Sequence, residues 1–119
     1  MDLQDDDSPI GVSTGPNQWL VVWYTDDTLG GTIGADYDIL ISRSTDNGAT
    51  WTAPAALNSN AATDSGDDFD PVIAGTPGGT WIAAFYTDDP LGGTIGGEVD
   101  ILFTTSAPVP VELSTFMLD

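Results

Sequence analysis

Cysteine and histidine are both absent from this sequence of 119 residues. Disulfide bonds, thiolate chemistry and the usual ligands of zinc, copper and haem are therefore excluded, and a bound metal would be a hard, oxygen-liganded ion such as calcium. Basic residues are nearly absent as well. Arg43 stands alone against 19 acidic residues, giving a formal net charge of −18. Such a chain repels nucleic acid and anionic membranes.

Long apolar runs are also missing, since none approaches the roughly 18 residues of a membrane span. We therefore expect no membrane insertion. The first seven residues lack the basic start and apolar stretch of a secretory signal, so the signal of an exported protein would have been removed or lie upstream. Because 40% of the residues are hydrophobic, we expect a folded protein. Bound cations or salt would relieve its self-repulsion.

An internal repeat organises the chain. Residues 19–44 align without gaps with residues 81–106 at an offset of 62, and 15 of these 26 positions are identical. The same offset places Asp5 and Asp6 on Asp67 and Asp68. A fixed period of this length is typical of repeat architectures. We expect two units, residues 1–66 and residues 67–119, the second with an atypical C-terminal strand.

Each unit is expected to form four short strands, because turn signals separate apolar stretches and no window has helical periodicity. The predicted strands are residues 9–13, 18–25, 38–44 and 51–58, then 71–74, 80–87, 100–105 and 111–116. Segments 19–24 and 81–86 are apolar on both faces and require cover from two sides. The sequence therefore predicts an all-β fold in which each unit is a four-stranded antiparallel β-propeller blade. An immunoglobulin-like sandwich, with one wet face per sheet, is the main alternative.

One motif lies between two predicted strands. Residues 44–51 have the spacing S-x-D-x-G-x-x-W. Ser44 and Asp46 can bind nearby backbone amides, Gly48 can adopt positive φ, and Trp51 can fold under the turn as an apolar anchor. The motif is a structural hairpin device without chemistry of its own.

With this motif the chain resembles the Asp-box, or BNR-repeat, family of sialidase-like β-propellers. Segments 19–24, 38–44 and 51–54 look like the second, third and fourth strands of such a blade, and residues 70–74 are similar to the opening of the next one. Residues 106–109 depart from the Asp-box pattern. The resemblance implies that the motif lies on the rim, away from a ligand site, and that the protein is extracellular or at the cell surface.

The resemblance does not extend to catalysis. Family sialidases bind their acidic sugar through three arginines and use a tyrosine nucleophile, whereas this chain has Arg43 alone, immediately before the motif. We therefore expect no enzyme activity from this chain. The expected function is a non-catalytic propeller module that acts as a surface scaffold or binds carbohydrate. The alternative is a fragment of a sialidase-like glycoside hydrolase whose catalytic residues lie outside this chain.

Acidic residues gather in two kinds of loop that share one end of a four-stranded blade, namely the connections between the second and third strands and between blades. We expect this end to be the ligand or metal face; its acids are Asp26, Asp27, Asp36, Asp38, Asp88, Asp89, Glu98 and Asp100, with Asp64, Asp67, Asp68 and Asp70 in the linker. Asp36, Asp38, Glu98 and Asp100 are candidate calcium ligands. Alternatively, these side chains cap turns and strand ends and bind no ligand. Sugar recognition beside Tyr37 or Phe69 is a third interpretation.

Two blades cannot close a ring, so the propeller is expected to be completed by oligomerisation or by missing repeats. Three or four copies would give six or eight blades, within the usual range of about four to eight. The alternative is a monomer whose repeats form a closed sandwich.

Overall fold

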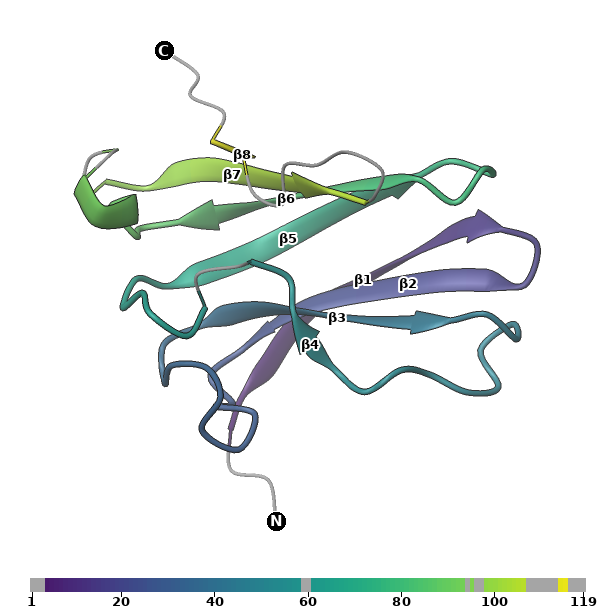
Figure 1. The fold of residues 1–119 in the computed structure, drawn as a ribbon, viewed down its shortest axis with the longest axis horizontal. Coiled ribbons are helices and arrows are strands. Elements are labelled where there is room, and N and C mark those ends of the chain that lie inside the picture. Colours follow the sequence, from purple (N-terminus) through teal and green to yellow (C-terminus); the bar gives the residue numbers. More distant parts are fainter. Residues whose placement is uncertain (1–3, 59–60, 94, 96–97, 107–113, 116–119) are drawn as a thin grey trace.

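The structure is a computed structural model, and it describes residues 4–58, 61–93, 95, 98–106 and 114–115. These residues contain eight strands, one short 3-10 helix (Leu91–Gly93) and no α-helix. Figure 1 shows the strands arranged as two antiparallel sheets. The expected all-β fold, with one antiparallel sheet for each repeat, is confirmed. The described residues do not close into a ring.

Strand order follows the chain in both sheets. The first sheet has the order β1 (Asp6–Gly15), β2 (Gln18–Thr25), β3 (Asp38–Ser44) and β4 (Ala55–Ala56). The second has the order β5 (Asp68–Gly75), β6 (Trp81–Thr87), β7 (Asp100–Thr105) and β8 (Ser114–Thr115). The boundary expected after residue 66 falls between β4 and β5.

The second, third and seventh strands match their predicted bounds, whereas β1 and β5 begin earlier than expected. In both, a β-bulge carries the strand past a proline, which lacks the N–H needed for regular pairing. Ser8 (φ 51°) and Asp70 (φ 52°) occupy equivalent positions in the two bulges. β4 is shorter than the predicted 51–58, and most of the predicted strand 111–116 lies outside the described residues.

Hydrogen bonds also repeat between the two units. The backbone N–H of Asp5 donates to Oδ1 of Asp26 over 2.8 Å, and the N–H of Asp67 donates to Oδ1 of Asp88 over 2.6 Å. Both pairs obey the offset of 62. The sequence repeat is therefore a structural repeat as well.

The core lies between the sheets. Val22 of β2 and Ile39 of β3 pack with Phe85 of β6 and Leu102 of β7. Because side chains alternate along a strand, Leu20, Val22 and Tyr24 form one face of β2, here called the Val22 face. Ala83, Phe85 and Thr87 form the Phe85 face of β6. The position equivalent to Val22 is Ala84, which lies on the other side of β6, so the two repeats bury opposite faces against each other.

Within the second sheet, β5 is the strand whose backbone comes closest to the first sheet, as Figure 1 shows. Equivalent positions of β1 and β5 come close together. Oγ of Ser8 lies 3.5 Å from Oδ1 of Asp70. A Cβ at Gly75 would lie 2.8 Å from Cγ2 of Thr14 and 3.2 Å from the carbonyl oxygen of Ser13. The first strands of the two repeats are thus direct neighbours.

Candidate functional site

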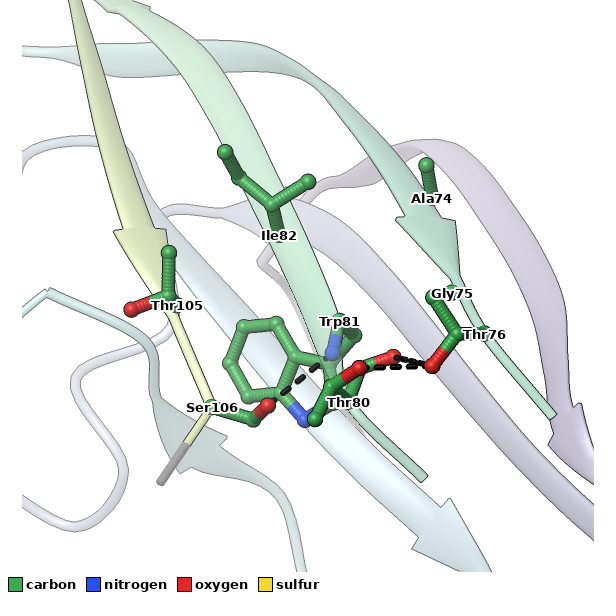
Figure 2. A pocket seen from close by; sticks show the side chains of 8 residues that line it. All are labelled: Ala74, Gly75, Thr76, Thr80, Trp81, Ile82, Thr105 and Ser106. Carbon is green, nitrogen blue, oxygen red and sulfur yellow. Dashed lines mark hydrogen bonds between the residues drawn. The ribbon is translucent and has the colours of Figure 1, made fainter. Parts of the chain in front are cut away.

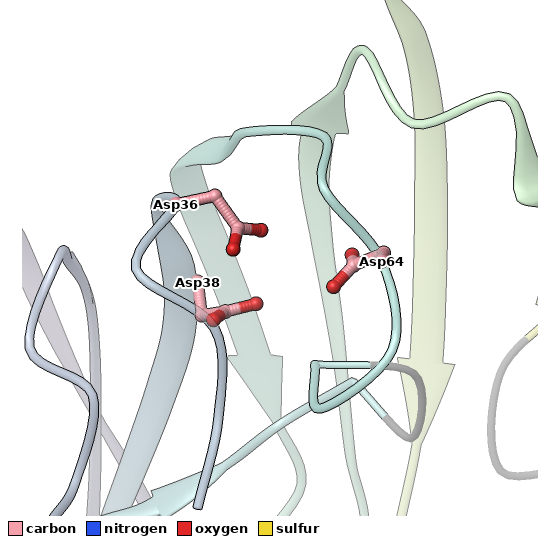
Figure 3. Close-up of side chains that lie close together, drawn as sticks. All are labelled: Asp36, Asp38 and Asp64. Carbon is pink, nitrogen blue, oxygen red and sulfur yellow. The ribbon is translucent and has the colours of Figure 1, made fainter. Parts of the chain in front are cut away.

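Three carboxylates converge where the β2–β3 loop meets the linker between the sheets. Asp36 lies near the end of that loop, Asp38 begins β3, and Asp64 belongs to the linker. Each offers an oxygen within 4.8 Å of the oxygens of the other two. Figure 3 shows the Asp64 side chain pointing across towards Asp36 and Asp38. The sequence placed all three acids at one end of the repeat, and the structure brings these three together.

These carboxylates are poorly compensated. Asp38 is 0% exposed, and among the described residues neither of its oxygens accepts a hydrogen bond of normal geometry, although the Asn58 side chain is near enough to lower its pKa. Both oxygens of Asp64 and Oδ2 of Asp36 are likewise buried without a hydrogen-bond partner. Close by, Asp68 at the start of β5 is 1% exposed, and its Oδ1 has no partner. Buried charged groups normally pair with a cation or a donor, so this cluster is energetically costly as it stands.

Burial and mutual repulsion raise the pKa values of these acids. Desolvation, with smaller contributions from Asp36 and Asp64, raises the pKa of Asp38 to about 7, although the Asn58 side chain opposes this shift. Desolvation and Asp36 raise the pKa of Asp64 to about 6. Desolvation, and to a lesser extent Asp64 and Asp38, raises that of Asp68 to about 8 against the effect of Thr87. Desolvation also raises the pKa of Asp36.

Backbone contacts hold the loop and the linker in place. The N–H of Gly34 donates to the carbonyl of Ala61 over 3.0 Å, and the N–H of Asp68 donates to the carbonyl of Tyr37 over 2.7 Å. The N–H of Tyr37 in turn donates to Oδ1 of Asp67 over 3.1 Å. A Cβ at Gly34 would collide with the Asp36 carboxylate, so glycine leaves the space that this side chain occupies.

Other predicted acids have structural roles. Asp26 and Asp88 accept the backbone amides described above, and Oδ1 of Asp27 and Asp89 accepts the N–H of Leu29 and Leu91, over 2.9 and 3.1 Å. Asp27 and Asp89 therefore cap turns, as the alternative interpretation expects, whereas Asp26 and Asp88 tie the end of a strand to the segment 21 residues earlier. The cluster contains neither Glu98, which is exposed, nor Asp100, which is half-buried. Asp70 is exposed in the bulge.

The 44–51 turn has the expected hydrogen bonds. Oγ of Ser44 accepts the N–H of Gly48 over 2.8 Å and donates to Oδ1 of Asp46 over 2.9 Å. The Thr50 side chain and N–H, with Ser44, lower the pKa of Asp46 to about 2. Gly48 has φ 88°, and the indole N–H of Trp51 donates to its carbonyl over 3.1 Å. Trp51 is 43% exposed, so it folds against the turn without being buried.

The second repeat lacks this sequence motif, and a hollow of about 290 Å³ surrounds the start of β6 (Figure 2). Its lining includes Trp81 and the hydroxyl side chains of Thr76, Thr80 and Ser106. In the first repeat the indole N–H of Trp19 donates to Oδ1 of Asn47 over 3.0 Å. The position equivalent to Asn47 is Val109, whose side chain carries no acceptor, and the buried Nε1 of Trp81 has no hydrogen-bond partner among the described residues.

Aromatic rings proposed as sugar platforms pack against other rings instead. Tyr37 meets Tyr24 edge-on, with ring centroids 5.3 Å apart, and Phe69 stacks on Tyr86 at 5.8 Å. Tyr37 and Phe69 are both half-buried.

Comparison with known proteins leaves the site to be interpreted from its own geometry. No protein-family model matches the chain, and no curated protein matches it significantly. Among the described residues, no helix has the length and apolar character needed to cross a membrane.

Proposed function

We propose that this chain is a non-catalytic scaffold module, consisting of two blades of a sialidase-like β-propeller whose ring is completed by further copies of the chain. Three or four copies would supply six or eight blades. The proposal rests on how the two repeats pack. Because the two sheets bury opposite faces against each other, each leaves its other face free, and further copies can add to both free faces with the same packing.

One observation carries the proposal: equivalent positions are covered in the first sheet and exposed in the second. Leu20 is 2% exposed, whereas its equivalent Ile82 is 45% exposed. Tyr24 is packed against the core, while its equivalent Tyr86 is 41% exposed. The Ile82 face of β6 (Ile82, Ala84 and Tyr86) therefore lacks the cover that the Val22 face receives. Exposed apolar patches of this kind mark interaction sites.

The opposite end of the chain offers a complementary surface. Phe85 is 2% exposed at the internal interface, and its equivalent Trp23, on the other side of β2 from Val22, is only half-buried. Trp19, on the same face as Trp23, is 40% exposed. If the Ile82 face of one chain packs on the Trp23 face of the next, the internal interface is repeated between copies. The close approach of β1 and β5 supports a ring arrangement, because the first strands of propeller blades converge around the central axis.

Light scattering during size-exclusion chromatography tests the proposal. The wild-type chain should have three or four times its mass of 12.4 kDa. Ile82→Lys should reduce this to a single chain, because it places a charge in the middle of the interface. Thr45→Lys adds the same charge in the exposed 44–51 turn and should leave the assembly intact. A folded monomeric wild type, or equal dissociation of both variants, contradicts the proposal.

Binding of a neutral carbohydrate is a second candidate function, favoured by the hollow in Figure 2. A tryptophan beside several hydroxyl groups offers a stacking surface and hydrogen-bond partners to a sugar. Calorimetric titration with neutral oligosaccharides tests this function. Trp81→Phe should abolish the binding heat, whereas Trp51→Phe, in the 44–51 turn, should preserve it. Absence of binding by the wild type to any oligosaccharide in a broad panel removes this candidate.

A further inference from the structure

We propose that Asp36, Asp38 and Asp64 bind one calcium ion, which ties the β2–β3 loop to the linker between the two sheets. All three ligands belong to one chain, so this inference does not depend on the proposed assembly. Asp38 comes from a strand and Asp36 from the loop before it, whereas Asp64 comes from the linker, more than 20 positions later in the sequence. Its purpose would be to fix the second sheet against the first.

Convergence of acids alone would not identify a site, but Asp38 provides a second observation. Its carboxylate is completely buried, faces the other two carboxylates and accepts no hydrogen bond of normal geometry from the described residues at either oxygen. Folding therefore removes this group from water, and the nearby Asn58 side chain, which lowers its pKa, replaces only part of its hydration. Such a group is stabilised by neutralisation, and a bound cation supplies charge and coordination together.

The spacing of the oxygens suits calcium. Three oxygens at the corners of an equilateral triangle with sides of 4.8 Å lie about 2.8 Å from its centre, close to the roughly 2.3–2.6 Å of calcium–oxygen bonds. A small movement of the side chains would reach that distance. Calcium accepts flexible and irregular sets of oxygen ligands, and water or backbone carbonyls can complete its coordination. Magnesium, which demands near-ideal octahedral geometry, should bind less well.

The protein has no cation of its own for this position. Lysine and histidine are absent, and the single arginine, Arg43, is exposed near the other end of β3. Five residues of extended strand separate Arg43 from Asp38, or about 17 Å at roughly 3.3 Å per residue. Over this distance a solvent-exposed charge is largely screened at physiological ionic strength. Neutralisation of the cluster therefore has to come from protons or from a bound ion.

Calorimetric titration and thermal unfolding test the proposal on protein stripped of metal with a chelator. One calcium ion should bind per chain, and saturating calcium should raise the Tm by at least about 5 °C, because only the folded state presents the site. Asp38→Asn and Asp64→Asn should each abolish both effects. Asparagine preserves the shape of aspartate and removes a buried charge, so these variants should fold without the ion.

The second repeat supplies the matched controls. Glu98→Gln and Asp100→Asn remove one charge each at the positions equivalent to Asp36 and Asp38, and should retain the calcium effect. Sodium chloride of equal ionic strength should produce no binding heat and a smaller rise in Tm, because it only screens the charges. Absence of calcium binding would overturn the proposal. So would an equal loss in all four variants, since this would indicate diffuse screening of the acidic surface.

Discussion

The hydroxyl of Ser44 binds two other residues of the 44–51 turn. It is 1% exposed, accepts the N–H of Gly48 and donates to Asp46. Ser44→Ala removes both bonds and leaves their partners to find water. Because each bond contributes about 0.5–1.5 kcal/mol and the exposed partners can only bind water instead, we expect the free energy of unfolding to fall by about 1–3 kcal/mol.

Urea denaturation at a fixed protein concentration measures this effect. Thr45→Ala is the control, because Thr45 is exposed in the same turn. Its stability should stay within about 0.5 kcal/mol of the wild type. If the two variants have the same stability, the hydroxyl of Ser44 does not hold the turn.

The buried acids predict how stability depends on pH in calcium-free solution. Asp64, Asp38 and Asp68 have folded-state pKa values of about 6, 7 and 8, above the roughly 3.9 of an unfolded aspartate. The folded state therefore binds more protons than the unfolded state between these limits. Their stabilising contribution is complete below about pH 4 and is lost as the pH rises towards 8.

Thermal unfolding between pH 4 and 9 in the presence of a chelator checks this sign. The Tm should decrease across the range, and Asp68→Asn should flatten the decrease because asparagine mimics the protonated acid. Asp6→Asn changes the equivalent residue of the first repeat, which is exposed, and should leave the slope unchanged. A Tm that rises from pH 5 to 8 would show that burial does not raise the pKa values of these acids in the folded state.

The acidic site shows what the sequence could and could not predict at the scale of residues. The order of strands in a four-stranded blade placed Asp36, Asp38 and the linker acids at one end of the sheets. Only the path of the linker decides that Asp64, rather than Glu98 or Asp100, completes the cluster. No local spacing encodes that contact, because it joins residues that are more than 20 positions apart in the sequence.

The linker between the two sheets packs closely against the β6–β7 loop. Gly66 is buried, and a Cβ at this position would lie closer than 3.0 Å to backbone atoms of Asp89. Gly66→Ala should therefore push the linker away from the β6–β7 loop. Overpacking of this kind costs about 1–3 kcal/mol.

Chemical denaturation compares this variant with Gly78→Ala in the β5–β6 turn. The nearest atom to a Cβ at Gly78 is Oγ1 of Thr76, 3.9 Å away, so this control should keep wild-type stability or gain slightly. Equal stabilities for the two variants would mean that the linker has room to move.

Strand prediction succeeded where the pattern depends on side chains and failed where it depends on backbone geometry. Alternation and turn residues located β2, β3 and β7. The bulges at Ser8 and Asp70 allow β1 and β5 to begin before a proline. The sequence does not predict this, because proline normally marks the end of regular pairing. β4 comprises Ala55–Ala56 alone. Before it, the Trp51 indole binds the Gly48 carbonyl in the turn, and Pro54 has no N–H to donate to β3.

At the scale of the whole molecule, charge dominates. With a net charge of −18, the compact state repels itself, and assembly would concentrate that charge further. Increasing salt shortens the screening length from about 30 Å at 0.01 M to about 10 Å at 0.1 M. We therefore expect the Tm to rise with salt in the presence of a chelator.

Differential scanning calorimetry at pH 8 measures this response. Sodium chloride and potassium chloride should act alike, because screening depends on ionic strength rather than on the identity of the ion. A Tm that is constant or falls with added salt would show that self-repulsion does not limit stability.

Repetition of the internal interface between copies is the central claim about the whole molecule. The most direct measurement is a crystal structure of the native assembly, from which the symmetry and the contacting faces can be determined. The account predicts a ring with a threefold or fourfold axis, in which the Ile82 face of each chain packs on the Trp23 face of the next. A monomer, or a twofold pair in which two Ile82 faces meet each other, would contradict it.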